Sequence, residues 1–315
     1  MSQTPTASVT ATATVPPITP PAPPKKGIGR YVAAIVLVLL LAWAFSGVQA
    51  NVPDLVSGAP QMMDTLSRML PPDTTLVTNK SNYDLPKDMS LPQLLLPLHV
   101  KPDLAQERSE WWNNSFPQTV LGAVLQTIQM ALAGTFLSLL IAFPLSFFAA
   151  RNTSPHPAVY HTVKLAINFF RTIPDFAVGL VLIAAVGLGA FPGTLALAFH
   201  TTTVLTKLFA ESIEDIDEGV VEALKATGAR RMQVLAYAVV PQVMPSFISF
   251  LLYRFETNIR AAAVLGLIGA GGIGFIMMTD FRMFQYPQAA MTVLVLIVLV
   301  MVVDYMSARL RLLVT

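Results

Sequence analysis

Long apolar segments with few charges dominate this chain from residue 118 onward. Hydropathy places them at about 118–149, 159–190, 193–211, 241–275 and 287–308, and an earlier one at 31–48. A helix needs about 20 apolar residues to cross the hydrocarbon core of a bilayer. Only 12% of the 315 residues are charged, which is half of the roughly 25% found in soluble domains. The sequence therefore predicts an all-α membrane protein with six transmembrane helices.

Lysines and arginines near the ends of these segments predict the orientation, because cytoplasmic loops carry an excess of them. Six spans place four basic groups on one side, namely Lys25/Lys26/Arg30, Arg151/Lys164, Lys225/Arg230/Arg231 and Arg309/Arg311. We therefore expect both the N- and the C-terminus to be cytoplasmic. The uncharged Phe191, Pro192 and Gly193 are expected to form a short outer loop, and Asp280 and Arg282 to lie in the other one.

Two polar segments flank the first apolar one. Residues 1–30 are rich in proline and are expected to form a disordered cytoplasmic tail. Residues 49–117 carry charges of both signs and are expected to form an extracytoplasmic loop region. The small-x-small triplet that ends at Ala50 also allows a second interpretation, in which 31–48 belongs to a cleaved signal peptide.

A polar interval from Glu211 to Tyr237 follows the fourth segment, on the predicted cytoplasmic side. Good helix formers run up to Ala226, and Gly228 suits a position where a helix ends. A short helix, a glycine break and a re-entry led by Pro241 would make a compact knob at the membrane surface. An ordinary solvated loop is the alternative.

Three charges, Arg254, Glu256 and Arg260, lie inside the fifth segment, where each unpaired charge costs about 2.5–3.5 kcal/mol. Glu256 and Arg260 are four residues apart and can pair on one helix face. Arg254 lies on another face, together with Asn258. Either the charges hold helices together, or Arg254 faces a path for an anionic substrate.

Two further charges, Arg171 and Asp175, flank Pro174 within the third segment. A proline there frees a backbone carbonyl, and these side chains could satisfy groups that a kink exposes. We count both among the candidate intramembrane polar residues. Lys207 and Glu211, four apart in the fourth segment, are expected to form an interfacial ion pair.

A glycine-rich stretch ends the fifth segment, with Gly269, Gly271, Gly272 and Gly274. It matches the GxGxxG pattern of nucleotide-binding folds, but no βαβ unit surrounds it. A helix break that acts as a gate is the preferred interpretation, and tight helix packing without gating is the alternative.

The sequence lacks the residues that a metal site, an ATP-binding loop or a nucleic-acid-binding surface would need. There is no cysteine, and His99, His156, His161 and His200 have no metal-ligand spacing, so no metal site is expected. No GxxxxGK[ST] loop is present to hold ATP phosphates. A net charge of +2 without a basic stripe gives no indication of nucleic-acid binding.

The polar interval resembles the cytoplasmic loop of bacterial ABC importer permeases, which reads Glu-Ala-Ala, three residues, Gly, nine residues, Ile-x-Leu-Pro. The chain has Glu222-Ala223-Leu224, Gly228 and Ala238-Val239-Val240-Pro241 at the same spacing. The resemblance implies a type I importer permease fold, with a permease core at 118–312 and a coupling loop at 212–240. It also implies that Glu222, Ala223, Leu224, Gly228 and Ala229 couple to a separate ATPase.

A longer string resembles the phosphonate importer permeases within that group. It consists of Tyr253-Arg254-Phe255-Glu256-Thr257-Asn258-Ile259-Arg260, followed by Gly269-Ala270-Gly271-Gly272-Ile273-Gly274. The resemblance implies a multi-pass protein of the bacterial inner membrane that transports phosphonate-like oxyanions. It implies no cofactor of its own, since ATP is bound by a partner subunit. The implied partners are a second copy of the chain, a cytoplasmic ABC ATPase dimer, an extracytoplasmic phosphonate-binding protein and the lipid bilayer.

Other functions remain open on the sequence alone. A related permease could carry phosphate, phosphite, methionine or a metal chelate. A membrane enzyme would need clustered acids and histidines or a serine–base pair, and neither is found. A passive channel would leave the match to the coupling loop unexplained.

Overall fold

The computed structural model describes residues 28–47, 52–78 and 102–313, and every regular element in these ranges is a helix. The chain divides into two compact units, 1–61 and 62–315. The predicted tail up to residue 27, the cleavage site at Ala50 and His99 lie outside the described ranges. What the sequence predicts for them stays a prediction.

In the first unit, helix α1 (Ile28–Gly47) corresponds to the first predicted segment. Its apolar stretch is 17 residues long, Tyr31–Gly47, which is about 26 Å at 1.5 Å per residue. Large apolar side chains such as Leu39 and Trp43 are exposed along it. An exposed apolar surface of this kind fits lipid better than water.

The predicted loop region at 49–117 is partly helical. It contains α2 (Val52–Arg68), α3 (Thr75–Thr78) and α5 (Pro102–Glu110), followed by a π turn at Trp111–Ser115 and a 3₁₀ turn at Phe116–Gln118. Phe116 stacks on Trp111 and Trp112, with ring centroids 4.6 and 5.3 Å apart. This aromatic cluster fixes the chain just before the first long helix of the bundle.

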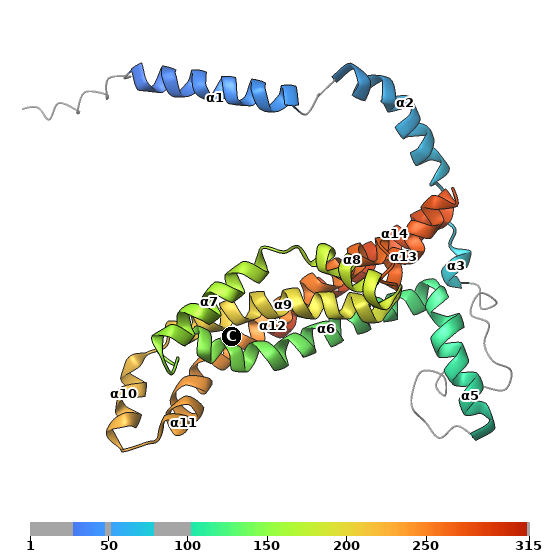
Figure 1. Ribbon diagram of the computed structural model, residues 1–315. Helices are drawn as coiled ribbons and strands as arrows, with labels where there is room; N and C mark the ends of the chain where they lie inside the picture. The colour runs from blue at the N-terminus through green and yellow to red at the C-terminus, as the bar shows by residue number, and fades with distance from the viewer. Residues whose placement is uncertain (1–27, 48–51, 79–101, 314–315) are drawn as a thin grey trace, which may run out of the picture. The chain divides into compact units, whose positions relative to one another are not determined.

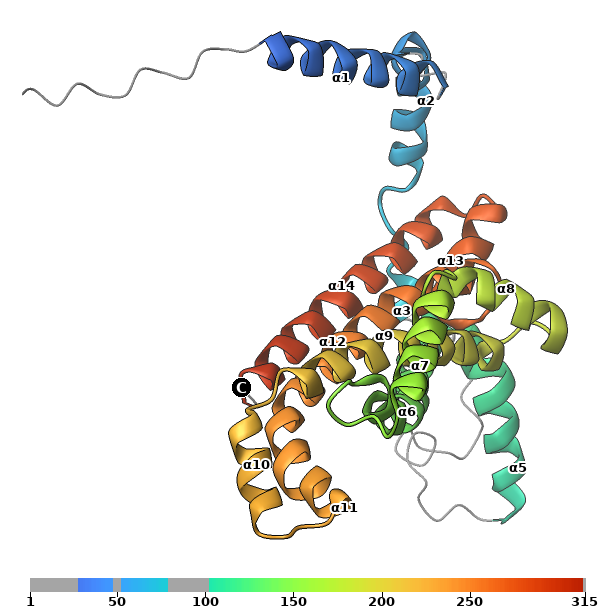
Figure 2. The same cartoon turned by 60° about the vertical axis from the view of Figure 1, so that its left-hand side comes forward.

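Four long helices form the body of the second unit and run side by side in both views (Figures 1 and 2). They are α6 (Val120–Ala149), α9 (Ala190–Glu214), α12 (Val240–Leu267) and α14 (Tyr286–Arg311). The most extensive packing joins α6 to α9, and α12 packs on both of them and on α14. Helices α6, α9 and α14 follow predicted segments closely, and α12 begins where the fifth predicted segment begins.

Small residues make the close approach of α6 and α9 possible. A Cβ on Gly134 of α6 would lie 2.9 Å from Cβ of Leu197 on α9, which is closer than real Cβ atoms approach. Alanine, serine and threonine fill much of the rest of the buried face of α6. Interfaces between membrane helices are enriched in such residues, because small side chains allow backbones to come close together. Nearer the C-terminal end of α9, Phe209 stacks on Phe247 of α12, with ring centroids 3.8 Å apart.

The third predicted segment, 159–190, is not one straight helix. It forms α7 (Pro157–Arg171) and α8 (Asp175–Val186), which are bent by 81°. Pro174 has no N–H to donate and disfavours helical geometry in the residue before it, so the break falls there. The prediction of an outer loop at 191–193 was wrong, because these residues form the first turn of α9. The turn lies earlier, at Gly187 and Gly189, which have φ values of 104° and 143°.

The fifth predicted segment, 241–275, is also divided. Helix α12 ends at Leu267, and α13 (Gly272–Arg282) follows after the glycine-rich turn. Asp280 and Arg282, expected in an outer loop, lie in the last turns of α13. Helices α10 (Glu218–Ala226) and α11 (Arg231–Val234) project from the other end of the bundle, where α14 ends (Figures 1 and 2).

Three helical stretches in the described residues are long and apolar enough to cross a membrane. They are Val120–Ala149, Arg231–Arg282 and Tyr286–Arg311, and the bent pair α7–α8 would make a fourth. The structure thus confirms an all-helical chain with several apolar helices. Six spans, with both termini cytoplasmic, stay a prediction.

Candidate functional site

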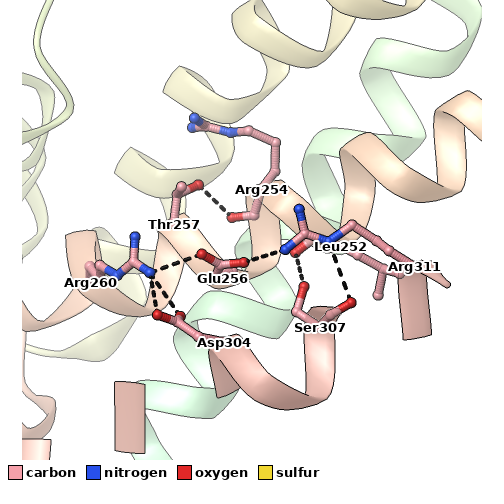
Figure 3. A network of polar contacts seen from close by, with 8 residues as sticks. All are labelled: Leu252, Arg254, Glu256, Thr257, Arg260, Asp304, Ser307 and Arg311. Atoms are coloured by element: carbon pink, nitrogen blue, oxygen red, sulfur yellow. Dashed lines mark hydrogen bonds and ion pairs between the residues drawn. The ribbon is translucent and has the colours of Figure 1, made fainter. Parts of the chain in front are cut away.

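An ion-pair network ties the middle of α12 to α14 (Figure 3). Glu256 accepts hydrogen bonds from Arg260 and from Arg311, both at 2.8 Å. Arg260 also donates to the two carboxylate oxygens of Asp304, at 2.8 and 2.7 Å. The pairing of Glu256 with Arg260 is confirmed. The network holds two acidic and two basic side chains, so its charges balance.

Arg254 does not join this network. Its guanidinium points away from Glu256 (Figure 3), and no carboxylate of the described residues lies within 4.0 Å of it. Its Nη2 donates instead to Oγ1 of Thr201 on α9, at 3.1 Å. Arg254 is residue 15 of the 28 in α12, about 21 Å from the first residue of that helix. An arginine thus lies at mid-helix without an ion-pair partner.

A chain of hydrogen bonds holds Arg254 in this position and crosses three helices. Thr201 donates to Oδ1 of Asn258 at 2.8 Å, and Nδ2 of Asn258 donates to Oγ1 of Thr135 at 2.8 Å. Thr135 donates in turn to the carbonyl oxygen of Ala131 on α6 at 2.6 Å. Arg254 and Asn258 therefore do share one face of α12. Thr201, Asn258 and Thr135 are all buried, so the bundle itself orients the arginine.

The break between α7 and α8 brings two more predicted residues near Arg254. Asp175 lies within electrostatic range of Arg254, and Arg171 within range of His200, which neighbours Thr201 in sequence. Asp175 Oδ1 accepts a hydrogen bond from the N–H of Phe176 at 2.9 Å. Arg171 is exposed in the last turn of α7. Arg171 and Asp175 thus lie in the region of His200 and Arg254, apart from the Glu256 network.

Helix α10 carries most of the predicted coupling residues at the projecting end. It begins at Asp217, whose side chain accepts from the N–H of Gly219 at 2.9 Å, and none of its residues is buried. Gly228 follows with φ of 82°, a value that glycine adopts readily, so the predicted glycine break is present. Pro241 does lie in the first turn of α12, but helical structure resumes ten residues earlier, at Arg231.

The coupling residues lie on different sides of α10. Glu222 lines a cavity of about 500 Å³ between α10, the π turn at Leu235–Val239 and the loop at 152–154, and Ala229 lines it as well. Ala223 and Val220 are exposed, and Leu224 is half-buried. Val220 and Ala223 therefore face outward, whereas Val221 packs against the core of the bundle and Glu222 is exposed where it lines the cavity.

The predicted glycines have separate roles in the turn between α12 and α13. Gly269, Gly271 and Gly272 have φ values of 103°, 79° and 68°, which side chains rarely tolerate. A Cβ on Gly274 would overlap the carbonyl oxygen of Ala263 on α12. The three turn glycines therefore provide the helix break, and Gly274 provides close packing.

Side chains of α6 cap the start of α13. The N–H of Gly272 donates to Oε1 of Gln126 at 2.7 Å, and the N–H of Ile273 donates to Oγ1 of Thr127 at 2.9 Å. These two hydrogen bonds hold the glycine turn against α6. Neither Gln126 nor Thr127 is distinguished in the sequence, because nothing local indicates contact with a turn that lies 146 residues away.

The partners of the α12 charges were also missed. They are Asp304 and Arg311 on α14 and Thr201 on α9, and Thr135 on α6 is the missed partner of Asn258. Among the described residues no group of three or more His, Asp or Glu side chains could hold a metal ion. The ion pair of Lys207 with Glu211 is present, at 3.6 Å.

Comparison with known proteins places this arrangement in a family. Residues 142–312, slightly more than half of the chain, match the family described as "Binding-protein-dependent transport system inner membrane component". The chain belongs to this family. It is thus a multi-pass inner-membrane permease subunit of the ABC importer type, as the coupling-loop spacing predicted.

Two individual relatives are described as permeases of phosphite and phosphonate transport systems. The chain is 45% identical over 188 residues to a phosphite transport system permease of Stutzerimonas stutzeri, covering 60% of this chain and 68% of that one. It is 49% identical over 117 residues to a putative cryptic phosphonate transport system permease of Escherichia coli, covering 37% and 96%. The predicted resemblance to phosphonate-type permeases is confirmed.

A solved structure shares the fold. The inward-facing MetNI methionine ABC transporter contains a chain that matches with a TM-score of 0.55 and 21% identity, covering 62% of this chain and 96% of that one. The likeness shows that the helix arrangement is that of an ABC permease.

Proposed function

We propose that this chain forms the translocation path for phosphonate-like oxyanions in an ATP-driven importer. The observation that carries the proposal is Arg254, a positive charge at mid-helix without an ion-pair partner among the described residues. Such a charge is costly in a bilayer unless a partner or water compensates for it. An anion that passes this point would supply the compensation during transport.

The two arginines of the Glu256 network do not offer the same opportunity. Arg260 and Arg311 already bind Glu256, and Arg260 also binds Asp304. A charge-balanced pair gives little attraction to a further anion. The proposal therefore assigns Arg254 to the path, and the Glu256 network to holding α14 against α12.

Relatives support the chemical class of the substrate. Both are described as permeases for phosphorus oxyanions, phosphite in one and phosphonate in the other. A guanidinium suits these substrates, because its planar donors match the oxygens of phosphate-like groups. Methionine is zwitterionic and would gain less from an uncompensated positive charge.

Coupling to ATP hydrolysis is assigned to the loop at 212–240, with α10 as its contact helix. The exposed Val220 and Ala223 give α10 a small apolar face that a partner protein can cover. Glu222, which is exposed and lines the cavity beside α10, would make a further contact with the ATPase. The full transporter would contain two copies of this chain, an ATPase dimer in the cytoplasm and an extracytoplasmic phosphonate-binding protein.

Reconstitution with the cognate ATPase and binding protein tests both the role in transport and the substrate class. Uptake into proteoliposomes is measured with 2-aminoethylphosphonate, phosphite, phosphate and methionine in turn. We expect ATP-dependent uptake of phosphorus oxyanions and none of methionine. Uptake of methionine alone would refute the substrate class, and a chain that binds no ATPase would refute the role in transport.

Two matched substitutions test the contact face of α10. Ala223→Arg places a long charged side chain on the exposed face of α10, and Ala105→Arg makes the same change on the exposed face of α5. Only the first should weaken copurification of the ATPase, by at least tenfold in apparent affinity. Equal effects of both would show that α10 is not the contact helix.

A further inference from the structure

Two buried polar atoms near the middle of the bundle have no hydrogen-bond partner. They are Nε of Arg254 on α12 and Nδ1 of His200 on α9, and Oγ of Ser249 is the third such atom in the described residues. Buried polar groups are almost always satisfied, because leaving one unpaired costs about 1–3 kcal/mol. Both atoms are therefore available for a hydrogen bond to a ligand.

The two side chains belong to one neighbourhood. Nη2 of Arg254 donates to Thr201, the residue that follows His200, at 3.1 Å. Consecutive Cα atoms are about 3.8 Å apart, so the guanidinium reaches the turn of α9 that carries the imidazole. His200 lies within electrostatic range of Arg254, Arg171 and Asp175, and the backbone of Ile173 lies beside it.

The hydrogen bonds of Arg254 leave one side of the guanidinium for a ligand. The bonds through Thr201, Asn258 and Thr135 use Nη2 and hold it against α9. Nε remains as a buried donor, and Nδ1 of His200 can carry a hydrogen and donate as well. Two donors, one of them charged, suit an acceptor with several oxygens.

We propose that Arg254 and His200 form an oxyanion-binding site between α9 and α12, at which a phosphonate or phosphite group accepts hydrogen bonds from Nε of Arg254 and Nδ1 of His200. The inference rests on the proposed transport of phosphorus oxyanions and adds a second ligand, His200, with Thr201, Asn258 and Thr135 as positioning residues. Asp175 is the acidic group nearby, and it limits how strongly the site holds an anion.

A weak site is what transport requires, since a bound ion must also leave. Arg171 and Arg254 give the neighbourhood two positive charges, and Asp175 gives it one negative charge. The neighbourhood therefore carries a net positive charge before an anion arrives. The Glu256 network on the α14 side contributes none, because its charges cancel.

The test uses the complete transporter in proteoliposomes, with phosphite and 2-aminoethylphosphonate as probes. Arg254→Gln should lower the transport rate at least tenfold, because it removes the charge and the Nη donors and leaves only a neutral amide where Nε lies. Lys207→Gln removes one positive charge from the same region of α9 and should leave transport within twofold. The amount of substrate moved per ATP hydrolysed separates loss of the site from loss of assembly.

Histidine replacements make the test specific to one atom. His200→Asn keeps a nitrogen donor one bond beyond Cγ, where Nδ1 lies, whereas His200→Gln moves the donor one bond farther out. We expect Asn to retain at least half of the transport rate, and Gln to lower it threefold or more. A role in packing alone would give the opposite order, because Gln is closer to histidine in size.

The outcomes separate the site from the proposed function. Transport of phosphorus oxyanions that survives both Arg254→Gln and His200→Gln would overturn the site and leave the function standing. No transport of these anions by the wild type would overturn both. Loss in Arg254→Gln and His200→Gln, with activity kept in His200→Asn, would support the site.

Discussion

Replacing Glu256 by glutamine removes the central acceptor of the network between α12 and α14. The change keeps the size of the side chain and takes away its charge. Glu256 is buried, with 11% of its side chain exposed, and it accepts from two guanidinium groups at 2.8 Å. We therefore expect a loss of stability that comes from electrostatics and not from a cavity.

The size of the loss follows from these two contacts. A hydrogen bond to a charged group contributes about 1.5–3 kcal/mol, so two contribute about 3–6 kcal/mol. The arginine side chains are 46% and 33% exposed, and solvent screening removes part of this. Glutamine can still accept one hydrogen bond. The free energy of unfolding should therefore fall by about 2 kcal/mol, or about 4–8 °C in the melting temperature for a domain of this size.

Thermal unfolding of the purified chain in nanodiscs measures the effect, with Asp304→Asn as the matched control. Asp304 is 40% exposed, and Arg260 keeps Glu256 when Asp304 is neutralised, so this change should cost under about 1 kcal/mol. Interhelical hydrogen bonds in membranes average about 0.6 kcal/mol. If Glu256→Gln lowers the free energy of unfolding by no more than about 0.6 kcal/mol, or by no more than Asp304→Asn does, the argument from paired charges is refuted.

Three further substitutions test two glycines and the amide of Asn258. Gly274→Ala should lower the free energy of unfolding by at least about 2 kcal/mol, because the new Cβ overlaps the carbonyl oxygen of Ala263. Gly58→Ala is the control, since its Cβ meets no atom within 4 Å, and it should be neutral in the same thermal assay. Gly228→Ala should cost about 1–2 kcal/mol through its positive φ, measured as weaker ATPase binding or a lower melting temperature, and an unchanged value would argue against the left-handed turn. Asn258→Leu breaks the link between Thr201 and Thr135 and should lower both stability, by about 1–3 kcal/mol, and transport; full transport would show that Arg254 needs no support.

Local patterns in the sequence predicted the features that depend on neighbours along the chain. The spacing of four residues placed Glu256 beside Arg260, and Gly228 ended α10 as its conformational freedom suggested. Hydropathy located α6, α9 and α14 to within a few residues, and it located the start but not the end of α12. These features depend on helix geometry and backbone preference, which a single segment contains.

Contacts between segments that are distant in the sequence could not be predicted. Arg311 and Thr135 lie 55 and 123 residues from their partners Glu256 and Asn258, and no local rule connects them. His200 was recognised only as a histidine without metal spacing, since its relation to Arg254 needs α9 and α12 to be packed together. A kink at Pro174 was predicted, but its angle of 81° was not, because hydropathy contains no information about the direction of a helix.

The bend gives Asp175 a position that differs in kind from that of Glu256. Glu256 and its arginines lie on α12 and α14, two helices packed along their length, so their separation is fixed by the bundle. Asp175 begins α8, immediately after the chain turns by 81°, and α8 packs mainly on α9. A rotation of α8 would change the field at Arg254 and leave the Glu256 network as it is. Arg254, which has no ion-pair partner among the described residues, therefore lies within electrostatic range of an acid on a different helix, and a passing oxyanion and Asp175 would compete for the same guanidinium.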